Sequence, residues 1–349
     1  MAQSLLFDIT PEAEGSKLQF VRRQLFVKAT PILPGNVDLT GKTAIVTGAN
    51  GDIGLECCRQ LLQLGLTKLI LAVRDESKGT AARSDLIADV KLGSDRVVEI
   101  WKLDYASYES VVAFAQRAEQ LPNRVDIVIL NAAVTRGSFS LNPTTGHEED
   151  VQTNYLSSVL LLVLFVGIFK KATLNAAEGA RRPPGRIVLV SSDTAAWAQF
   201  KEKDQRPLLE AFDKKPKNFD IYERYYTTKL LGQLFVTEIA KRVPPSLAIV
   251  NCANPGLCYS GLQRELSTVM ATWIRFFGRA PTVGARSLVS AATVHDEKSH
   301  GQYIEDGKLR PMAPYTYSQD AALVVQQLWN ETMQELSFAG VHEIMADLK

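Results

Sequence analysis

The segment TGANGDIG, residues 47–54, most constrains what this chain can fold into. The apolar residues 44–46 lead into it and predict a short buried strand, and residues 55–64 leave it with helical spacing. A glycine-rich turn between a strand and a helix presents free amides at the helix N-terminus, where a pyrophosphate binds well. The glycines of this turn are Gly48, Gly51 and Gly54. Their spacing fits a dinucleotide-binding fingerprint loosely, and a glycine turn without any ligand is the alternative.

From Lys42 onward, short β-rich runs alternate with longer helical patterns. The runs are residues 43–47, 68–73, 97–103, 127–130, 186–190 and 248–252. This alternation predicts an α/β fold with a doubly wound parallel sheet, in which ligands bind at the carboxyl ends of the strands. Residues 1–40 mix charges, aromatics and prolines, which predicts an arm lying on a single domain rather than a domain of their own.

The composition argues against several classes of function. The 349 residues carry a formal net charge of +1 without a long basic run, so nucleic acid is not an expected partner. The four cysteines lack the spacing of a zinc site, so we expect no metal and interpret them as buried thiols in a reducing compartment. No basic-then-apolar leader with a small-residue cleavage site opens the sequence, so we expect a cytoplasmic protein.

Residues 156–169 form a strongly apolar run. A helix of this length covers roughly 20 Å, which is short of the roughly 30 Å hydrocarbon core of a bilayer. We therefore expect a buried helix and no integral membrane segment.

The residues after the second predicted strand bear on the choice of a nicotinamide cofactor. A cofactor without a 2′-phosphate usually meets a carboxylate about 20 residues past the glycines, whereas the phosphorylated form meets arginine. The neutral Val73 occupies the place of the carboxylate, and Arg74 follows it. This order favours NADP(H), although Asp75 comes next, and a solvated arginine at a strand end is the alternative.

Other strand ends carry residues suited to a cofactor. Asp104 follows the third predicted strand, where it could bracket an adenine. Asn131 and Ala132 follow the fourth, where small residues would let the backbone approach a cofactor closely, although a simple strand-end turn explains them nearly as well. Asn154 opens the apolar helix, where its alternative role is an N-terminal cap.

Tyr225 and Lys229 stand four residues apart in a stretch with helical spacing, so one helix face presents both the phenol and the ammonium group. A nearby cation lowers the pKa of a tyrosine and makes it a usable proton donor and acceptor near neutral pH. Such a pair occurs by chance in many helices. The order strengthens the interpretation, because the pair follows a glycine turn, an asparagine and Ser192 at the end of the fifth strand.

Together these residues resemble a short-chain dehydrogenase/reductase over roughly residues 40–305, with less specific agreement to 337. The resemblance implies one Rossmann-like domain over 41–337 and a tail over 338–349. The stretches FVRRQLFVKATPILP and LWNET resemble the retinol-dehydrogenase-like branch, especially fungal members of secondary-metabolite pathways. The family's catalytic tetrad maps onto Asn154, Ser192, Tyr225 and Lys229.

The resemblance implies an NADP(H)-dependent interconversion of a carbonyl and an alcohol. In that scheme Tyr225 exchanges a proton with the substrate oxygen, and Lys229 lowers the tyrosine pKa and binds the nicotinamide ribose. Ser192 holds the carbonyl oxygen, and Asn154 positions Lys229 through a water. The residues expected to bind the cofactor are Gly48, Asn50, Gly51, Asp52, Ile53, Gly54, Arg74, Asp104, Asn131, Ala132, Tyr225, Lys229, Pro255 and Gly256.

The chain departs from the family pattern in two places. The family has glycine where this chain has Asp52, and a carboxylate there would repel a pyrophosphate, so we expect weakened cofactor binding provided the side chain can turn to solvent. Ser192 and Tyr225 are also farther apart than is usual, which predicts an inserted loop over residues 193–224 near the substrate mouth.

Residues 257–283 carry apolar residues at helical spacing where the family has a mobile substrate flap. This favours a small lipophilic carbonyl or alcohol substrate, with core packing or a membrane-surface contact as alternatives. The apolar helix near Asn154 often packs against a second subunit in this family, which allows a homodimer. Two other functions stay open, a non-redox isomerase or cyclase, and a catalytically silent cofactor-binding protein that Asp52 favours and the intact tetrad disfavours.

Overall fold

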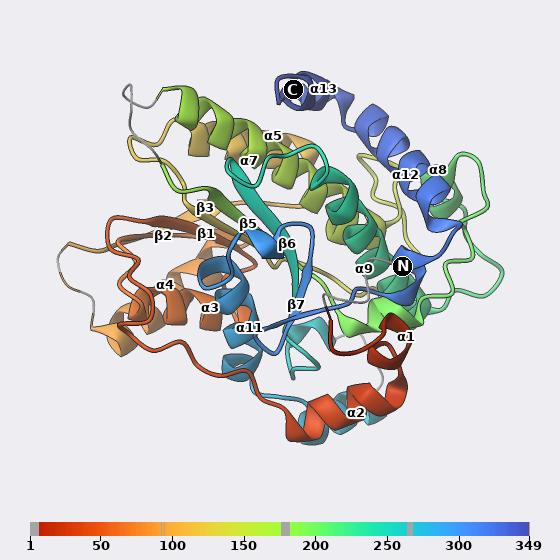
Figure 1. Cartoon of the computed structure of the whole chain (residues 1–349), viewed down its shortest axis with the longest axis horizontal. Helices are drawn as coiled ribbons and strands as arrows, with labels where there is room; N and C mark the ends of the chain where they lie inside the picture. The colour runs from red at the N-terminus through yellow and green to blue at the C-terminus, as the bar shows by residue number, and fades with distance from the viewer. Residues whose placement is uncertain (1–6, 92, 94, 176–181, 264–267, 349) are drawn as a thin grey trace.

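The computed structural model describes residues 7–91, 93, 95–175, 182–263 and 268–348. One eight-stranded sheet in the order β3-β2-β1-β4-β5-β6-β7-β8 organises them (Figure 1). The strands are β1 (Thr43–Thr47), β2 (Lys68–Val73), β3 (Val97–Lys102), β4 (Ile127–Leu130), β5 (Gly185–Val190), β6 (Ala248–Asn254), β7 (Tyr303–Glu305) and β8 (Lys308–Arg310). All pairs are parallel except β7 with β8, and the strand order reverses between β1 and β4. The predicted doubly wound, Rossmann-like sheet is confirmed.

Helices cover both faces of the sheet. The helices are α1 (Pro11–Glu14), α2 (Lys17–Phe26), α3 (Asp52–Gln63), α4 (Glu76–Val90), α5 (Tyr108–Glu119), α6 (Glu149–Val151), α7 (Ser157–Leu174), α8 (Leu208–Phe212), α9 (Ile221–Ile239), α10 (Thr268–Phe277), α11 (Pro281–Thr293), α12 (Ala321–Glu335) and α13 (Val341–Ala346). Figure 1 shows α3, α4 and α11 on one face and α5, α7 and α9 on the other.

Alternate residues of the buried strands feed two separate cores. In β1, Ile45 packs with the helices α5, α7, α9 and α12, while Ala44 and Val46 pack with α3, α4 and α11. This is the pattern of a parallel sheet covered on both faces, whose strands are apolar throughout. The four free cysteines, as predicted, are buried.

The expected length of the apolar helix was wrong. A π-helical turn, η2 (Gln152–Leu156), joins α6 to α7, and the continuous helix Glu149–Leu174 has 26 residues. Within the described residues it is the one helix long and apolar enough to cross a membrane, but 67% of its apolar window is buried inside the protein. Its burial therefore identifies it as a core helix, whereas its length alone would allow it to span a membrane.

The helix α7 is covered by elements of its own chain. It packs against α5 and α13, and a Cβ at Gly167 would lie 3.1 Å from the side chain of Ile344 in α13. The C-terminal tail thus folds back onto the helix that the resemblance places at a subunit interface.

The segment 193–224 is more ordered than a loop. It holds a 3-10 turn, η3 (Asp193–Trp197), and α8, and Phe200 and Phe212 are buried in the core. The helix α9 begins at Ile221, inside the expected loop, because the Asp220 side chain caps it by accepting hydrogen bonds from two following amides. Shorter turns are η4 (Gly261–Gln263), η5 (Glu297–Ser299), η6 (Pro314–Tyr317) and η7 (Ser337–Ala339).

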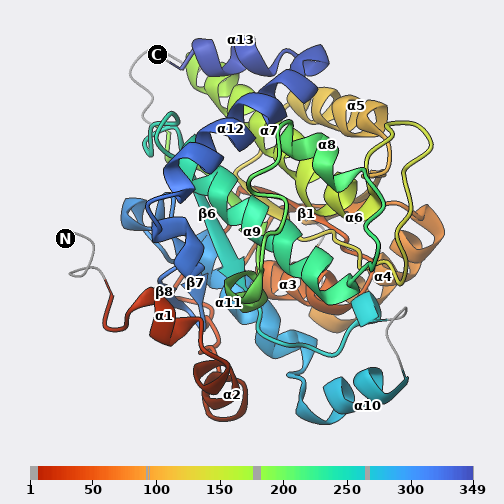
Figure 2. The same ribbon diagram turned by 90° about the vertical axis from the view of Figure 1, so that its right-hand side faces the viewer.

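The N-terminal arm forms two helices, α1 and α2, at one edge of the molecule, and Figure 2 shows α10 at the same lower edge as α2. The Gln24 side chain donates hydrogen bonds to the backbone oxygens of Leu257 and Phe277, each at 2.8 Å. This anchors the arm to the segment that follows β6, which is the segment expected to cover a substrate.

Candidate active site

The glycine turn between β1 and α3 has room for a ligand at one position and is tightly packed at the others. Gly48 has a φ of +64°, and a Cβ at Gly54 would lie 2.3 Å from the Gly48 oxygen. A Cβ at Gly51 would meet nothing within 4 Å. Gly48 and Gly54 therefore shape the turn, while Gly51 leaves open space at the N-terminus of α3. Asn50 and Ile53 lie in the same turn, and Ile53 lines the cavity described below.

Asp52 occupies backbone that favours glycine. Its φ is +50°, in the left-handed region that side chains other than Asn and Asp rarely adopt. Its side chain is exposed, and its Oδ2 accepts a hydrogen bond from the Gly261 amide at 2.7 Å. The carboxylate is thus engaged by the segment after β6.

The two charged residues after β2 have different surroundings. Asp75 caps α4, because its Oδ1 accepts hydrogen bonds from the amides of Ser77 and Lys78 at 3.0 and 3.3 Å. The hydrogen bond that the Ser77 hydroxyl donates to the same oxygen at 2.5 Å, together with that from the Lys78 amide, holds the pKa of Asp75 below its ordinary value. Arg74 is exposed at the carboxyl end of the strand.

The ends of β1 and β4 are tied together. The Thr47 hydroxyl accepts hydrogen bonds from the amides of Asn131 and Ala132, both at 2.9 Å, and the Asn131 side chain donates to the Thr47 oxygen. A Cβ at Gly48 would lie 3.1 Å from the Ala132 Cα. Only small residues fit this close approach at the switch point of the sheet, where ligands bind in doubly wound folds. Asp104, after β3, instead accepts a hydrogen bond from the Ala106 amide, as in a strand-end turn.

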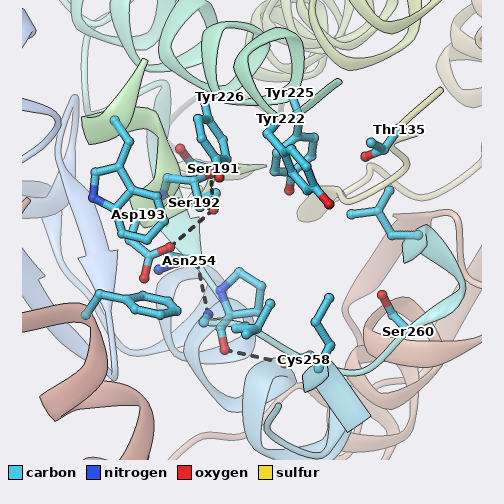
Figure 3. A pocket seen from close by; sticks show the side chains of 18 of the residues that line it. Thr135, Ser191, Ser192, Asp193, Tyr222, Tyr225, Tyr226, Asn254, Cys258 and Ser260 are labelled. Carbon is cyan, nitrogen blue, oxygen red and sulfur yellow. Dashed lines mark hydrogen bonds between the residues drawn. The ribbon is translucent and has the colours of Figure 1, made fainter. Parts of the chain in front are cut away.

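The predicted tyrosine and serine face one cavity. Tyr225 points into it from α9, and Ser192 approaches from the end of β5 (Figure 3). The Ser192 Oγ accepts hydrogen bonds from the Thr194 hydroxyl at 2.9 Å and the Thr194 amide at 3.2 Å. Ser191 is held apart by a hydrogen bond from Gln233 at 3.0 Å, so its hydroxyl has a structural partner.

Lys229 lies one turn further along α9. Its Nζ donates a hydrogen bond to the Val190 oxygen at 2.9 Å and lies 5.6 Å from the centroid of the Tyr225 ring. Burial lowers the pKa of Lys229 to about 8, and electrostatic interactions with Cys252 and Asp150 oppose this shift.

The expected lowering of the Tyr225 pKa is not found. Burial raises this pKa above its ordinary value, the Asp193 carboxylate raises it further, and a hydrogen bond with Ser192 opposes both. Burial removes the water that would solvate the ionised phenol, and the nearby Asp193 carboxylate disfavours a second negative charge.

Asn154 is not a helix cap, which corrects the alternative role considered for it. It lies inside the π-helical turn η2 and is buried. Its Oδ1 accepts a hydrogen bond from the Val134 amide at 2.8 Å, and its Nδ2 donates to the Val134 oxygen at 2.9 Å and to Thr228 at 3.2 Å. Such turns are frequent at functional sites, and this one holds the loop after β4 against α9.

The cavity has a volume of about 810 Å³ and lies at the carboxyl ends of β5 and β6. Apolar and aromatic side chains dominate its lining, with Tyr222 and Tyr226 around Tyr225 (Figure 3) and the Trp197 ring against Tyr226. Pro255 and Gly256, after β6, also line it. This is the composition of a site for a largely apolar small molecule.

Sequence reasoning did not predict that helix α2 and Tyr222 contribute to this cavity. Phe20 and Val21 of α2 line it, although the arm was expected only to lie on the domain, and Tyr222 was not singled out. A helical reading of α9 could have found Tyr222, because it lies three residues before Tyr225 and shares its face. Nothing local to residues 1–40 indicates where the arm packs.

The segment over the cavity contains α10. Leu257, Leu262 and Ile274 line the cavity, as a substrate flap would. Phe276 points away and is 78% exposed. The expected flap residues Arg264 and Leu266 lie outside the described residues, as do the side chains of Met270 and Trp273.

The arrangement can exchange a proton with a substrate oxygen and hold that oxygen in place. Tyr225 and Ser192 offer two hydroxyl groups to the cavity, and the Lys229 ammonium is buried behind them. The open turn at Gly51 and the small residues at the ends of β1 and β4 fit a dinucleotide. Among the residues described, no group of three or more His, Cys, Asp or Glu side chains could hold a metal ion.

Comparisons with known proteins agree with this geometry. The family model for short chain dehydrogenase matches residues 42–201. The short-chain dehydrogenase fogG of Aspergillus ruber is 48% identical over 99% of both chains. The short chain dehydrogenase/reductase mfmJ of Annulohypoxylon moriforme is 37% identical over 95% of this chain and 94% of its own.

Two solved structures share the fold at low identity. The oxidoreductase yciK from E. coli has a TM-score of 0.57 at 19% identity, covering 80% of this chain and 98% of its own. An NADPH-bound short chain oxidoreductase from Pseudomonas aeruginosa PAO1 has a TM-score of 0.56 at 21% identity, covering 77% and 96%. From the curated relatives, which align along nearly its whole length, this chain belongs to the short-chain dehydrogenase/reductase family.

Proposed function

We propose that this protein is an NADP(H)-dependent oxidoreductase that interconverts a carbonyl and an alcohol on a lipophilic substrate. The observation that carries this is the meeting of Tyr225 and Ser192 in one apolar cavity with Lys229 buried beside the tyrosine. The relatives in Aspergillus ruber and Annulohypoxylon moriforme support a role in fungal secondary metabolism. The buried free cysteines fit a reducing, cytoplasmic setting.

The preference for NADP(H) rests on the two residues after β2. Asp75 is committed to capping α4, so its carboxylate is a poor partner for a ribose 2′-hydroxyl. Arg74 is exposed at the position from which a guanidinium meets a 2′-phosphate. A guanidinium suits that phosphate because it offers several donors in a fixed plane.

In the proposed mechanism a bound NADP(H) supplies or accepts the hydride. Tyr225 donates its phenolic proton to the carbonyl oxygen in reduction and takes it back in oxidation. Ser192 holds that oxygen beside the phenol. Lys229 binds the nicotinamide ribose and, when protonated, places a positive charge 5.6 Å from the centre of the Tyr225 ring. Apolar side chains of the cavity wall surround the place where the substrate carbonyl would lie.

Fluorescence titration tests the cofactor. We expect the protein to bind NADPH clearly more tightly than NADH, and Arg74→Ser to weaken NADPH binding roughly 10- to 100-fold while leaving NADH binding unchanged. Equal affinity for the two cofactors would contradict the role of Arg74. Binding of neither would favour a catalytically silent protein or a non-redox enzyme, for which the carboxylate of Asp52 at the N-terminus of α3 is the specific observation.

Turnover tests the acid–base role. With NADPH and a panel of aromatic aldehydes and ketones, we expect Tyr225→Phe to lower kcat by roughly 100- to 10,000-fold. Tyr226→Phe is the matched control, because it removes the neighbouring phenol that also lines the cavity, and we expect it to stay within a few-fold of the parent. Similar losses in both variants would show that Tyr225 is not the proton donor.

A further inference from the structure

Arg23 of the N-terminal arm is buried against the active site. Its side chain is 4% exposed and forms ion pairs with three carboxylates. It contacts Glu14 of α1, and its Nη2 lies 3.1 Å from Glu305 Oε1 in β7 and 3.4 Å from Asp193 Oδ2. Arginines are seldom buried this completely without a structural or functional reason.

Asp193 connects Arg23 to the serine expected to hold the substrate oxygen. The Ser192 hydroxyl donates a hydrogen bond to Asp193 Oδ1 at 3.3 Å, while the other carboxylate oxygen faces Arg23. The Thr194 hydroxyl donates a hydrogen bond to the Ser192 Oγ at 2.9 Å. The orientation of the serine therefore depends on the orientation of the carboxylate (Figure 3).

We propose that Arg23 is a positioning residue for Ser192, acting through Asp193, so that the N-terminal arm is part of the active site. This rests on the proposed function, in which Ser192 holds the carbonyl oxygen. The fixed fork of a guanidinium suits the task, because it can hold Glu305 and Asp193 at once and so fix the plane of the second carboxylate.

The charges around this cluster explain why a cation is needed. Burial raises the pKa of Asp193, and the nearby Arg23 opposes that rise most, followed by the hydrogen bond with Ser192 and the charge of Arg279. Glu305 is likewise buried beside Asp193 and Arg23. Without the guanidinium, Asp193 would take up a proton or turn away, and either change alters what it offers to Ser192.

The arm has anchors that do not use the Arg23 guanidinium. Trp197 donates a hydrogen bond to the Gly15 oxygen at 2.8 Å, and Gln24 binds the backbone at Leu257. Arg279 donates a hydrogen bond to the backbone oxygen of Arg23 at 2.6 Å, and this bond does not depend on the side chain at position 23. A variant of Arg23 is therefore expected to keep the arm docked.

The experiment compares Arg23→Met with Arg22→Met, which removes an exposed cation from the same helix. With NADPH and 4-nitrobenzaldehyde or the most active carbonyl of the panel, we expect Arg23→Met to lower kcat roughly 10- to 100-fold. The KM for the carbonyl and the Kd for NADPH should stay within about twofold. Arg22→Met should match the parent, and Arg23→Lys should recover part of kcat.

A double variant tests the route through Asp193. If Arg23 acts through this carboxylate, Arg23→Met combined with Asp193→Asn should lose no more kcat than the worse single variant. If the fold-loss of kcat in the double variant equals the product of the two single losses, Arg23 does not act through Asp193. A kcat of Arg23→Met equal to that of Arg22→Met would overturn the proposal itself.

Crystal structures of the parent and Arg23→Met with NADP+ give a readout without a substrate. We expect the Ser192 hydroxyl to leave its contact with Asp193 in the variant while α2 keeps its place, and an unchanged Ser192 would contradict the proposal. If the parent reduces no carbonyl, the proposed function fails, and the position of Ser192 alone then decides whether Arg23 positions it.

Discussion

Asp52 is the residue at which backbone conformation and binding chemistry conflict. Its φ of +50° costs an ordinary side chain free energy that glycine would not lose, although aspartate tolerates this region better than most residues. Its carboxylate follows directly on the open position at Gly51, yet it is engaged by the Gly261 amide. The exposed Asp52 side chain thus bonds to the segment after β6, which is compatible with the condition that it turn away from a bound pyrophosphate.

We expect Asp52→Gly to bind NADPH about two- to fivefold more tightly, because it removes a negative charge at a helix N-terminus. Fluorescence titration measures this. Asp52→Asn is the control, since it removes the charge and keeps a side chain that can accept the bond from Gly261. An equal gain in both variants would assign the effect to charge, a gain only in Asp52→Gly would assign it to the backbone, and no gain would contradict the prediction.

Single residues were predictable where type and spacing carry the chemistry. The spacing of Tyr225 and Lys229 places both on one face of α9, and Ser192 follows from its strand end. Arg23 and Asp193 were not predictable in the same way, because their contact joins residues 170 positions apart. The prediction of a lowered Tyr225 pKa was wrong for a related reason, since the burial that raises this pKa is a property of the whole fold.

At the scale of elements, two glycines of the turn between β1 and α3 have different roles: Gly54 is needed for packing, and Gly51 leaves space for a ligand. A Cβ at Gly54 would lie 2.3 Å from the Gly48 oxygen, whereas a Cβ at Gly51 meets nothing. We expect Gly54→Ala to lower the free energy of unfolding by about 1–3 kcal/mol, as overpacking does. Gly51→Ala should change it by less than about 1 kcal/mol, because its backbone is extended.

The same pair of variants should differ in cofactor binding. We expect Gly51→Ala to weaken NADPH binding although its stability is unchanged, since the added methyl enters the space left for the ligand. Urea unfolding measures stability and fluorescence titration measures binding. If Gly51→Ala binds NADPH like the parent, the open space at this turn is not used by the cofactor.

The elements that were predicted are those with a strong local pattern. The first six strands are β-rich runs, and each was predicted within two residues at either end. The strands β7 and β8 are three residues each and too short for a periodicity. The sequence does carry a local signal for them, because an Asp-Gly pair is typical of a tight hairpin turn. In the structure Asp306 and Gly307 have φ of +52° and +76°, as such a turn requires.

At the scale of the whole molecule, segments remote in sequence close over the core. The segment containing α8 is held to α12, because Glu331 accepts hydrogen bonds from the amides of Leu208 and Leu209 at 2.9 and 2.8 Å. The same region is tied to the loop before α6 by His147. These contacts turn an expected loop into part of the folded domain, and no local pattern in residues 193–224 encodes them.

His147 joins three elements through two carboxylates. Its Nδ1 lies 2.9 Å from Asp213 Oδ2 and its Nε2 lies 3.0 Å from Glu335 Oε1. Burial alone would lower its pKa, but the hydrogen bonds to the two carboxylates outweigh burial and raise the pKa from 6.5 to about 9. The protonated ring therefore stabilises the fold fully below about pH 6.5, and this stabilisation is lost as the pH rises through 9.

We expect the free energy of unfolding of the parent, measured with urea between pH 6 and pH 9.5, to fall more steeply than that of His147→Gln. The difference should be on the order of 2–3 kcal/mol across this range. The exposed His342 provides the control, and His342→Gln should follow the parent. Asp150, whose pKa burial raises to about 8, titrates in the same range, but it is present in every variant and cancels in the comparison. Parallel curves for the parent and His147→Gln would show that the charge on this ring does not hold the three elements together.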